Sequence, residues 1–376
     1  MCGLLAALVA APTENPPARS YRACVDLLAS AVSALGFEHR RLEIPSPADA
    51  PREALSAWTG PPGPTLYFHG HYDVVPAQAP EQFEPRLEGD TLFGRGSSDM
   101  KSGLVAMLYA VKALQTAGLT RRGRLGLMFV PDEETGGEYG SAALAREGEL
   151  ARDAIGMLLP EPTSGVVWNA NRGAISLEVT VKGRAAHVGL AHLGVNAFER
   201  AVTIVNALAA LKARLAGSIL LVGGRVEAGS NFNVVPDECR FTIDRRINPD
   251  EDFDREKGRL VDLLDEARAG GIELEVRTLQ EGRTSESSAD SLLGHALAAS
   301  ITQVTGKPAT FEMCPGLLET RFYAARGVPA YAYGPGILAV SHGPQEFVKI
   351  SRMMECANVY ALTAARMLRD AGVPSA

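Results

Sequence analysis

Three hydrophobic runs of this chain each end in residues that can bind metal ions or transfer protons. The stretch TLYFHGHYDVVPA shows the pattern, because apolar residues lead directly into His71 and Asp73. The acidic residues that follow the other two runs, RLGLMFV and AIGMLL, are Glu133, Glu134 and Glu161. Carboxylates and imidazoles beside a hydrophobic core are costly unless they are paired or coordinated. Their recurrence therefore predicts a site that binds a cation or moves protons.

The elements that must position these residues are buried strands and the helices between them. We expect strands at 65–69, 124–130 and 154–159, because each is a continuous apolar run. Between the first two, 102–118 has apolar residues along one helical face and ends at a glycine. This alternation predicts an α/β fold with a mostly parallel sheet and helices on both faces. In such sheets ligands bind at the carboxyl ends of the strands.

Two further residues extend the candidate site. Asp99 stands in GRGSSDMKSG just before the expected helix, and His342 stands in the late loop GPGILAVSHGPQEF. The acidic members of the set are Asp73, Asp99, Glu133, Glu134 and Glu161. Like charges in one cleft cannot all ionise without compensation, and two divalent cations would nearly neutralise them. Imidazole and carboxylate ligands favour zinc, with cobalt or manganese as alternatives.

Each residue also has an ordinary interpretation on its own. His71 could be a hydrogen-bonded structural histidine, Asp99 could cap the following helix, and Glu161 could lie in a surface turn. The DEE triplet could be a solvated loop, and His342 could be exposed and idle. Their joint position at strand ends favours the metal site. A nucleotide cofactor is not expected, because GRGSSD has an aspartate where the dinucleotide fingerprint needs glycine or alanine.

The pattern changes after about residue 172, where apolar and polar residues begin to alternate. The order strand, helix, strand, strand, helix, strand predicts a small inserted α+β domain, followed by a polar return loop at 280–290. A chain of 376 residues also exceeds the usual size of one hydrophobic core. We expect domains at 1–171, 172–284 and 285–376, the first and last forming one α/β domain.

Composition excludes several classes of protein. The net charge of −7 gives no footprint for nucleic acid. No run reaches the ~18 apolar residues of a membrane span, and the apolar start lacks the basic residues of a signal peptide. Five scattered cysteines without a C-x-x-C pair are typical of reduced thiols in a cytoplasmic protein.

Taken together, the motifs resemble one known family. GHYDVVP, GRGSSDMKSG, DEETGG, EPT, GRAAHVGLAHLGVNA, NVVP, DRRINP and SHGPQEF occur in family order over nearly the whole chain. The family is that of the di-zinc amidohydrolases and exopeptidases, with acetylornithine deacetylase, succinyl-diaminopimelate desuccinylase, aminoacylase and glutamate carboxypeptidase. The resemblance implies a zinc-exopeptidase-like fold whose inserted domain serves as lid and dimerisation surface, in a homodimer.

The resemblance also implies a role for each matching residue. One zinc ion would be held by His71 and Glu161, the other by Glu134 and His342, with Asp99 bridging both. Other implied features are general base and acid catalysis by Glu133 on a water shared by the ions, orientation of a ligand histidine by Asp73, a cis peptide bond at 99–100, and oxyanion stabilisation by His187. The implied substrate contacts are Arg246, Asn233, Arg321, Gly334 and Gly336.

The expected reaction is hydrolysis of the amide bond of an N-acyl-amino acid. A dipeptidase or a glutamate-carboxypeptidase-like metallopeptidase on the same scaffold is the alternative, because it would use the same catalytic set. A binding protein that keeps only the fold is a third interpretation, although no ligand or base is missing here. Glu319 stands where the family often has aspartate, and Ala191 where it often has proline. His69 matches no ligand position.

Overall fold

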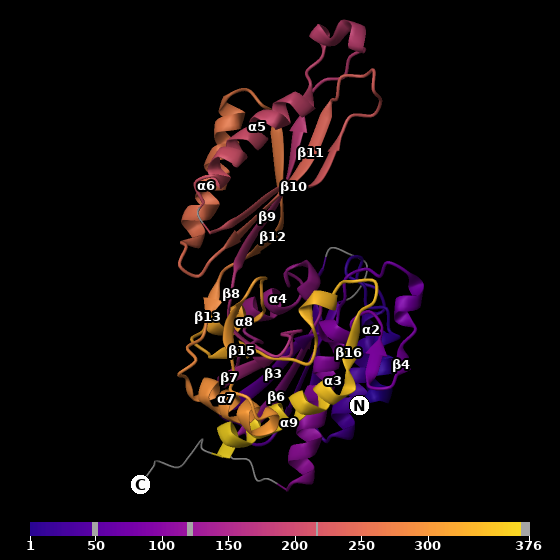
Figure 1. Cartoon of the computed structure of the whole chain (residues 1–376), viewed down its shortest axis with the longest axis vertical. Helices are drawn as coiled ribbons and strands as arrows, with labels where there is room; N and C mark the ends of the chain where they lie inside the picture. Colours follow the sequence, from indigo (N-terminus) through magenta and orange to yellow (C-terminus); the bar gives the residue numbers. More distant parts are fainter. Residues whose placement is uncertain (47–51, 119–122, 216, 370–376) are drawn as a thin grey trace. The chain divides into compact units, whose positions relative to one another are not determined.

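The chain forms two compact units in the computed structural model, which describes residues 1–46, 52–118, 123–215 and 217–369 (Figure 1). Unit 1 comprises Met1–Ala170, Glu286–Cys314 and Leu318–Ala376. Unit 2 comprises Asn171–Ser285 and Pro315–Leu317. None of the helices among the described residues is long and apolar enough to cross a membrane.

A large mixed sheet forms the centre of unit 1. Its strand order is β1-β2-β6-β3-β7-β15-β8-β13, with β14 pairing with β8. The four central strands run parallel, and they are β6 (Arg124–Val130), β3 (Thr65–His71), β7 (Ala154–Leu159) and β15 (Ala330–Ala332). The others are β1 (Glu38–Ile44), β2 (Arg52–Thr59), β8 (Val167–Asn171), β13 (Ser285–Glu286) and β14 (Phe311–Cys314). Antiparallel pairing occurs on the flanks, between β1, β2 and β6 and between β15 and β8.

Helices cover both faces of this sheet, as the sequence predicts. Consecutive strand residues point to opposite faces, and Tyr67 of β3 packs on Tyr323 of α8 (Thr320–Ala324). Its neighbour Phe68 packs instead on Tyr360 of α9 (Ile350–Arg369). Helices α3 (Ser102–Thr116) and α7 (Leu292–Thr305) both contact α9. His71 shares the Tyr67 face, so the metal-type residues lie away from the α9 side.

Unit 1 also contains three short strands that the sequence did not predict. A three-stranded sheet has the order β16-β5-β4, with β4 (Arg86–Glu88), β5 (Thr91–Phe93) and β16 (Phe347–Lys349). The remaining α-helices of this unit are α1 (Cys2–Val9), α2 (Tyr21–Ala34) and α4 (Ser141–Arg146). Single turns occur at Pro80–Phe83, Ser97–Lys101, Glu133–Thr135 and Leu338–Val340.

Unit 2 has the predicted order of strands and helices. Its elements are β9 (Gly173–Lys182), α5 (Ala197–Lys212), β10 (Ile219–Ala228), β11 (Glu238–Ile247), α6 (Phe253–Ala269) and β12 (Leu274–Gly282), with a turn at Val188–Leu193. The antiparallel sheet has the order β10-β11-β9-β12, and α5 and α6 pack side by side against one face (Figure 1). The predicted return loop at 280–290 was placed too early, because β12 continues to Gly282 and β13 follows.

Candidate dinuclear metal centre

The carboxyl ends of three neighbouring parallel strands carry the candidate site. Strand β3 ends at His71, and Glu161 lies two residues beyond the end of β7. Strand β6 leads into the turn that holds Glu133 and Glu134. Because β6, β3 and β7 are adjacent and parallel, their carboxyl ends share one edge of the sheet. The topology therefore brings together residues that lie up to 90 positions apart in the sequence.

Five of these side chains form two groups with metal-ligand geometry. In the first group, His71 Nε2 lies 3.4 Å from Asp99 Oδ1 and 3.9 Å from Glu161 Oε1. In the second, His342 Nε2 lies 3.3 Å from Asp99 Oδ2 and 3.2 Å from Glu134 Oε2. Asp99 belongs to both groups and turns one carboxylate oxygen to each. This is the arrangement expected of a residue that bridges two cations.

Unpaired buried atoms test whether a metal fits this site. Among the candidate ligands, three atoms are fully buried without a hydrogen-bond partner in the part of the chain that the structure describes: His71 Nε2, Glu134 Oε1 and Glu161 Oε1. Buried polar atoms almost always have a partner, so such atoms need an explanation. One cation in each group would satisfy all three atoms. The donor set of imidazole nitrogens and carboxylate oxygens suits a first-row divalent metal.

The electrostatics of the site also indicate a need for positive charge. Burial raises the pKa of Glu161 well above its usual value, and the nearby Asp99 carboxylate raises it further. Hydrogen bonds to Asp99 and Glu134 raise the pKa of His342 to about 11. Burial alone would raise the pKa of Asp99, but the neighbouring His342 and His71 imidazoles lower it. Positive charge therefore stabilises these carboxylates, which is the compensation that cations in the two groups would provide.

Asp73 contacts both His71 and the loop that carries the two glutamates. His71 Nδ1 lies 3.0 Å from the Asp73 carbonyl oxygen and 3.5 Å from its Oδ1. Since a carbonyl only accepts, Nδ1 is the nitrogen that donates to Asp73, and Nε2 is the nitrogen that faces the site. The backbone N–H groups of Glu133 and Glu134 each donate to the Asp73 carboxylate at 3.2 Å. Asp73 is also held by the side-chain amide of Asn15 at 2.9 Å.

A buried network fixes the start of the glutamate loop. Asp132 has a positive φ of 74° and forms an ion pair with Arg52 at 2.6 Å. The same carboxylate accepts hydrogen bonds from the backbone N–H of Tyr139 and the hydroxyl of Thr135. Asn15 Nδ2 lies 3.1 Å from Asp132 Oδ1. Sequence reasoning missed Asn15 and Arg52, because neither lies near a motif and their partners are distant in the chain.

Glu133 lies beside the first group without being part of either. Its Oε2 is 3.9 Å from His71 Nε2, and its side chain is 17% exposed. Burial raises the pKa of Glu133 well above its usual value. His71 acts to lower this pKa, whereas the neighbouring carboxylates act to raise it. A carboxylate in this position can exchange protons with a molecule in the site. The peptide bond between Asp99 and Met100 is cis, as the family resemblance implies.

Three predicted substrate contacts lie in unit 1, where their surroundings are defined. Arg321 is buried and donates to the carbonyl oxygens of Leu318 at 2.7 Å and Gly136 at 2.9 Å. A Cβ atom on Gly334 would lie 2.2 Å from the Glu161 carbonyl oxygen. A Cβ atom on Gly336 would lie 2.2 Å from the Ser98 carbonyl oxygen. Both glycines therefore permit close backbone contact with segments that carry candidate metal ligands.

The other predicted contacts belong to unit 2. His187 is exposed, and its Nδ1 accepts a hydrogen bond from the Gly189 N–H at 3.1 Å, which leaves Nε2 as a donor. Arg246 forms two hydrogen bonds with Asp244, at 2.6 and 3.0 Å. The carbonyl oxygen of Asn233 accepts from the Val188 N–H.

His69, which matches no ligand position, has a partner in the structure. Its Nε2 lies 2.8 Å from Glu319 Oε2, and both side chains are completely buried. The hydroxyls of Ser141 and Tyr323 lie 3.1 and 3.3 Å from its ring nitrogens. Glu319 is the residue that departs from the family's aspartate, so this departure is accommodated by a buried histidine beneath the site.

Comparisons with known proteins agree with this geometry. The model of Peptidase family M20/M25/M40 matches residues 67–366. Succinyl-diaminopimelate desuccinylase of Thioalkalivibrio sulfidiphilus (strain HL-EbGR7) is 27% identical over 364 residues, covering 92% of this chain and 93% of the relative. The metallo-carboxypeptidase Sso-CP2 of Sulfolobus solfataricus shares the fold, with a TM-score of 0.83 at 18% identity over 98% of this chain and 99% of that chain. The di-peptidase Dug1p of Saccharomyces cerevisiae does so with a TM-score of 0.82 at 15% identity, over 99% and 96%. The chain belongs to peptidase family M20/M25/M40 and is a metal-dependent hydrolase of amide bonds.

Proposed function

We propose that this protein removes the acyl group from an N-acyl-amino acid by hydrolysis of the amide bond. The observation that carries the proposal is the pair of ligand groups joined by Asp99, with Glu133 beside them but in neither. The full-length similarity to a succinyl-diaminopimelate desuccinylase supports an acylated amino acid as substrate.

Two divalent ions, zinc in the first instance, are the proposed cofactors. His71 and Glu161 would hold one ion, Glu134 and His342 the other, and Asp99 would contact both. Bound metal ions polarise a carbonyl and lower the pKa of water, which is the chemistry that amide hydrolysis needs at neutral pH. Cobalt or manganese would suit the same ligands.

Glu133 is the proposed general base and acid. Its carboxylate would take a proton from the attacking water and later return it to the leaving amine, so the products are a carboxylate and a free amine. Glu134, one residue later, turns Oε2 toward His342 and so has a separate role. Asp73 supports both tasks, because it binds the backbone of both glutamates.

Residues of both units are proposed to contact the substrate. The His187 tautomer leaves Nε2–H free to donate to a developing oxyanion. Arg246 would bind a substrate carboxylate, with Asp244 holding its guanidinium in place. Asn233, Arg321, Gly334 and Gly336 are proposed to line the pocket.

A dipeptidase or carboxypeptidase is the alternative function. The solved structures that share this fold include a di-peptidase and a metallo-carboxypeptidase. A panel of N-acetyl-amino acids, N-succinyl-diaminopimelate and dipeptides separates the two, with kcat/KM measured for each at saturating zinc. Preference for an acylated amino acid supports the proposal, and turnover of dipeptides alone would overturn it.

A homodimer formed through unit 2 is also proposed. Strand β10 is an edge of its sheet, and its exposed apolar residues are Ile219, Leu221 and Val226. Phe232, in the loop after it, is 96% exposed. An exposed apolar edge strand readily pairs with a second strand. The double variant L221K/V226K should be monomeric in sedimentation experiments, whereas an unchanged mass would contradict this interface.

The cysteines support a reducing compartment, and we propose the cytoplasm. The five cysteines all lie among the described residues, no disulfide joins them, and four of them are buried. Scattered reduced thiols are typical of proteins that are kept under reducing conditions. Fractionation of the source cells, with the protein found outside the cytoplasmic fraction, would contradict this location.

A further inference from the structure

A buried ion pair joins the two chain segments that carry Asp99 and His342. Arg95 and Glu346 are 1% and 2% exposed, and Arg95 Nη1 lies 2.6 Å from Glu346 Oε2. The two residues are 251 positions apart in the sequence. Arg95 lies four residues before Asp99, and Glu346 lies four residues after His342.

Glu346 holds the backbone of the segment that contains the bridging ligand. Its Oε1 accepts hydrogen bonds from the N–H groups of Ser98 at 2.9 Å and Asp99 at 3.0 Å. One of these N–H groups belongs to Asp99 itself and the other to the residue before it. Both oxygens of the Glu346 carboxylate are therefore engaged, one by Arg95 and one by the Asp99 segment.

Arg95 extends the connection to His342. Its Nη2 donates to the His342 carbonyl oxygen at 3.2 Å. His342 needs such a support, since its side chain is 49% exposed and its φ is 64°, in the left-handed region. A ligand on an exposed loop keeps its position only if its backbone is fixed elsewhere.

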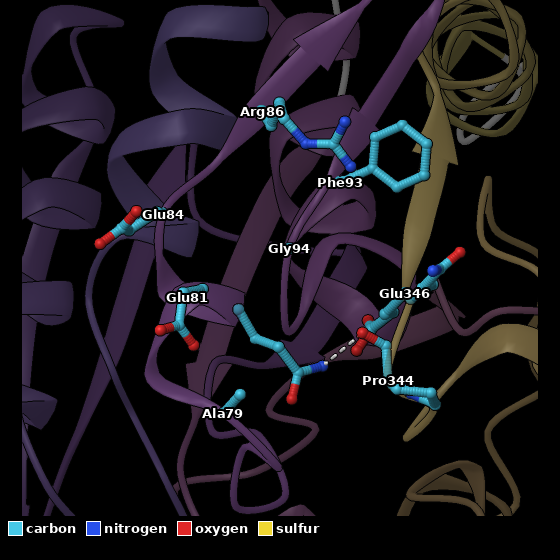
Figure 2. Close-up of a pocket in the computed structure, with 10 residues that line it drawn as sticks. Ala79, Glu81, Glu84, Arg86, Phe93, Gly94, Pro344 and Glu346 are labelled. Atoms are coloured by element: carbon cyan, nitrogen blue, oxygen red, sulfur yellow. Dashed lines mark hydrogen bonds between the residues drawn. The ribbon is translucent and has the colours of Figure 1, made fainter.

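Neighbouring contacts hold the same two segments together. The Gly94 N–H donates to the Glu346 carbonyl oxygen at 3.0 Å, and Gln82 Nε2 donates to Gly343 at 3.0 Å. Strand β16 pairs with β5 directly after this point. Figure 2 shows Glu346, Pro344 and Gly94 at one pocket, which Arg86 and Phe93 also line. The volume of this pocket is about 250 Å³. The Arg95–Glu346 pair is therefore one of several contacts between the same two segments of the chain.

We propose that Arg95 and Glu346 are positioning residues that set the distance between Asp99 and His342 and so create the second metal group. A buried ion pair is weak support for stability by itself, because desolvation offsets much of the attraction. Here the pair makes three hydrogen bonds to backbone groups of the Ser98–Asp99 and His342 segments. The inference rests on the proposed metal centre, which it extends to residues outside the ligand set.

Two variants disrupt this connection in different ways. In E346Q the amide oxygen can still accept from Ser98 and Asp99, but the amide N–H₂ opposes the Arg95 guanidinium. In the double variant R95M/E346Q that repulsion is absent, but the ion pair and the Arg95 hydrogen bond to His342 are both lost. The matched control is E256Q in unit 2, where Glu256 forms a buried pair with Arg245 at 2.9 Å. H342A and H71A serve as references, because H342A removes a candidate ligand of the second group and H71A removes one of the first.

Zinc binding to the metal-free full chain is measured by calorimetry, with thermal unfolding of the metal-free chain alongside. Wild type and E256Q should bind two ions. E346Q and R95M/E346Q should keep one ion near wild-type affinity and bind the other at least about tenfold more weakly, as outer-shell changes do, and they should resemble H342A rather than H71A. Two ions at wild-type affinity in both variants overturns the inference, and so does equal weakening of both ions. A wild type that binds no ion overturns the proposed function and the inference together.

Discussion

Substitution of Gly336 by alanine should displace the segment that carries Asp99. An ideal Cβ atom at this position lies 2.2 Å from the Ser98 carbonyl oxygen and 2.7 Å from Pro162 Cβ. Ordinary van der Waals contact begins at 3.4 Å, so one backbone must move by roughly 1.2 Å. Ser98 directly precedes Asp99, and Pro162 directly follows Glu161, so the movement reaches two ligands of the first group.

The expected loss follows from the size of this movement. A misplacement of ~1 Å at a catalytic site can cost about 100-fold in rate, which corresponds to about 2.7 kcal/mol of transition-state stabilisation. Overpacking should also lower the free energy of unfolding by about 1–3 kcal/mol. The loss of activity should therefore exceed what the loss of stability explains at 25 °C, where the variant remains folded.

The assay is kcat/KM for the best substrate of the panel at saturating zinc, with urea unfolding of the same preparation. G258A is the matched control, because Gly258 lies inside α6 with nothing within 4 Å of an added Cβ. That variant should keep full activity and gain about 1 kcal/mol of stability from helix propensity. Activity of G336A within about twofold of wild type, with both metal ions bound, would refute the reasoning from close approach.

Three further predictions concern the proposed general base Glu133, the protonation of His342, and the buried pair of Arg52 and Asp132. E133Q should keep its metal ions and lose about 10²–10⁴ in kcat; unchanged hydrolysis would contradict general base catalysis. Because the pKa of His342 is raised to about 11, its imidazole is charged at pH 7, and metal binding must release a proton. The affinity for zinc should therefore rise with pH. Calorimetry in buffers of different ionisation enthalpy measures the protons released on binding, and no release would contradict this prediction. R52M should cost about 3–5 kcal/mol in urea unfolding, since it leaves Asp132 buried without its charge partner, whereas the exposed R86M should cost under about 1 kcal/mol.

The sequence predicts much of the parallel core, because its strands are long apolar runs. The structure places strands at Arg124–Val130 and Ala154–Leu159, as expected, and β3 extends two residues beyond the predicted end at 69. Strands β1 and β2 were missed. The pattern of β1 is mostly exposed, so it lacks the continuous apolar signal of a central strand. The three-residue strands β4, β5 and β16 are too short to show a period.

The candidate ligands are predictable because strand ends and motifs mark them. Their supports are not predictable from local sequence. Arg95 and Glu346 fall inside motifs, but nothing local indicates that they meet across 251 positions. Asn15 has no motif at all, yet it reaches Asp73 and Asp132. Such contacts depend on how distant loops fold over one edge of the sheet.

The most direct test of the central claim is the metal content per chain, measured by elemental analysis after purification without chelator and again after loading with zinc. Convergence of His71, Asp99, Glu134, Glu161 and His342 predicts about two ions for wild type and about one for H342A. No bound ion after loading would mean that the five side chains do not form the proposed centre.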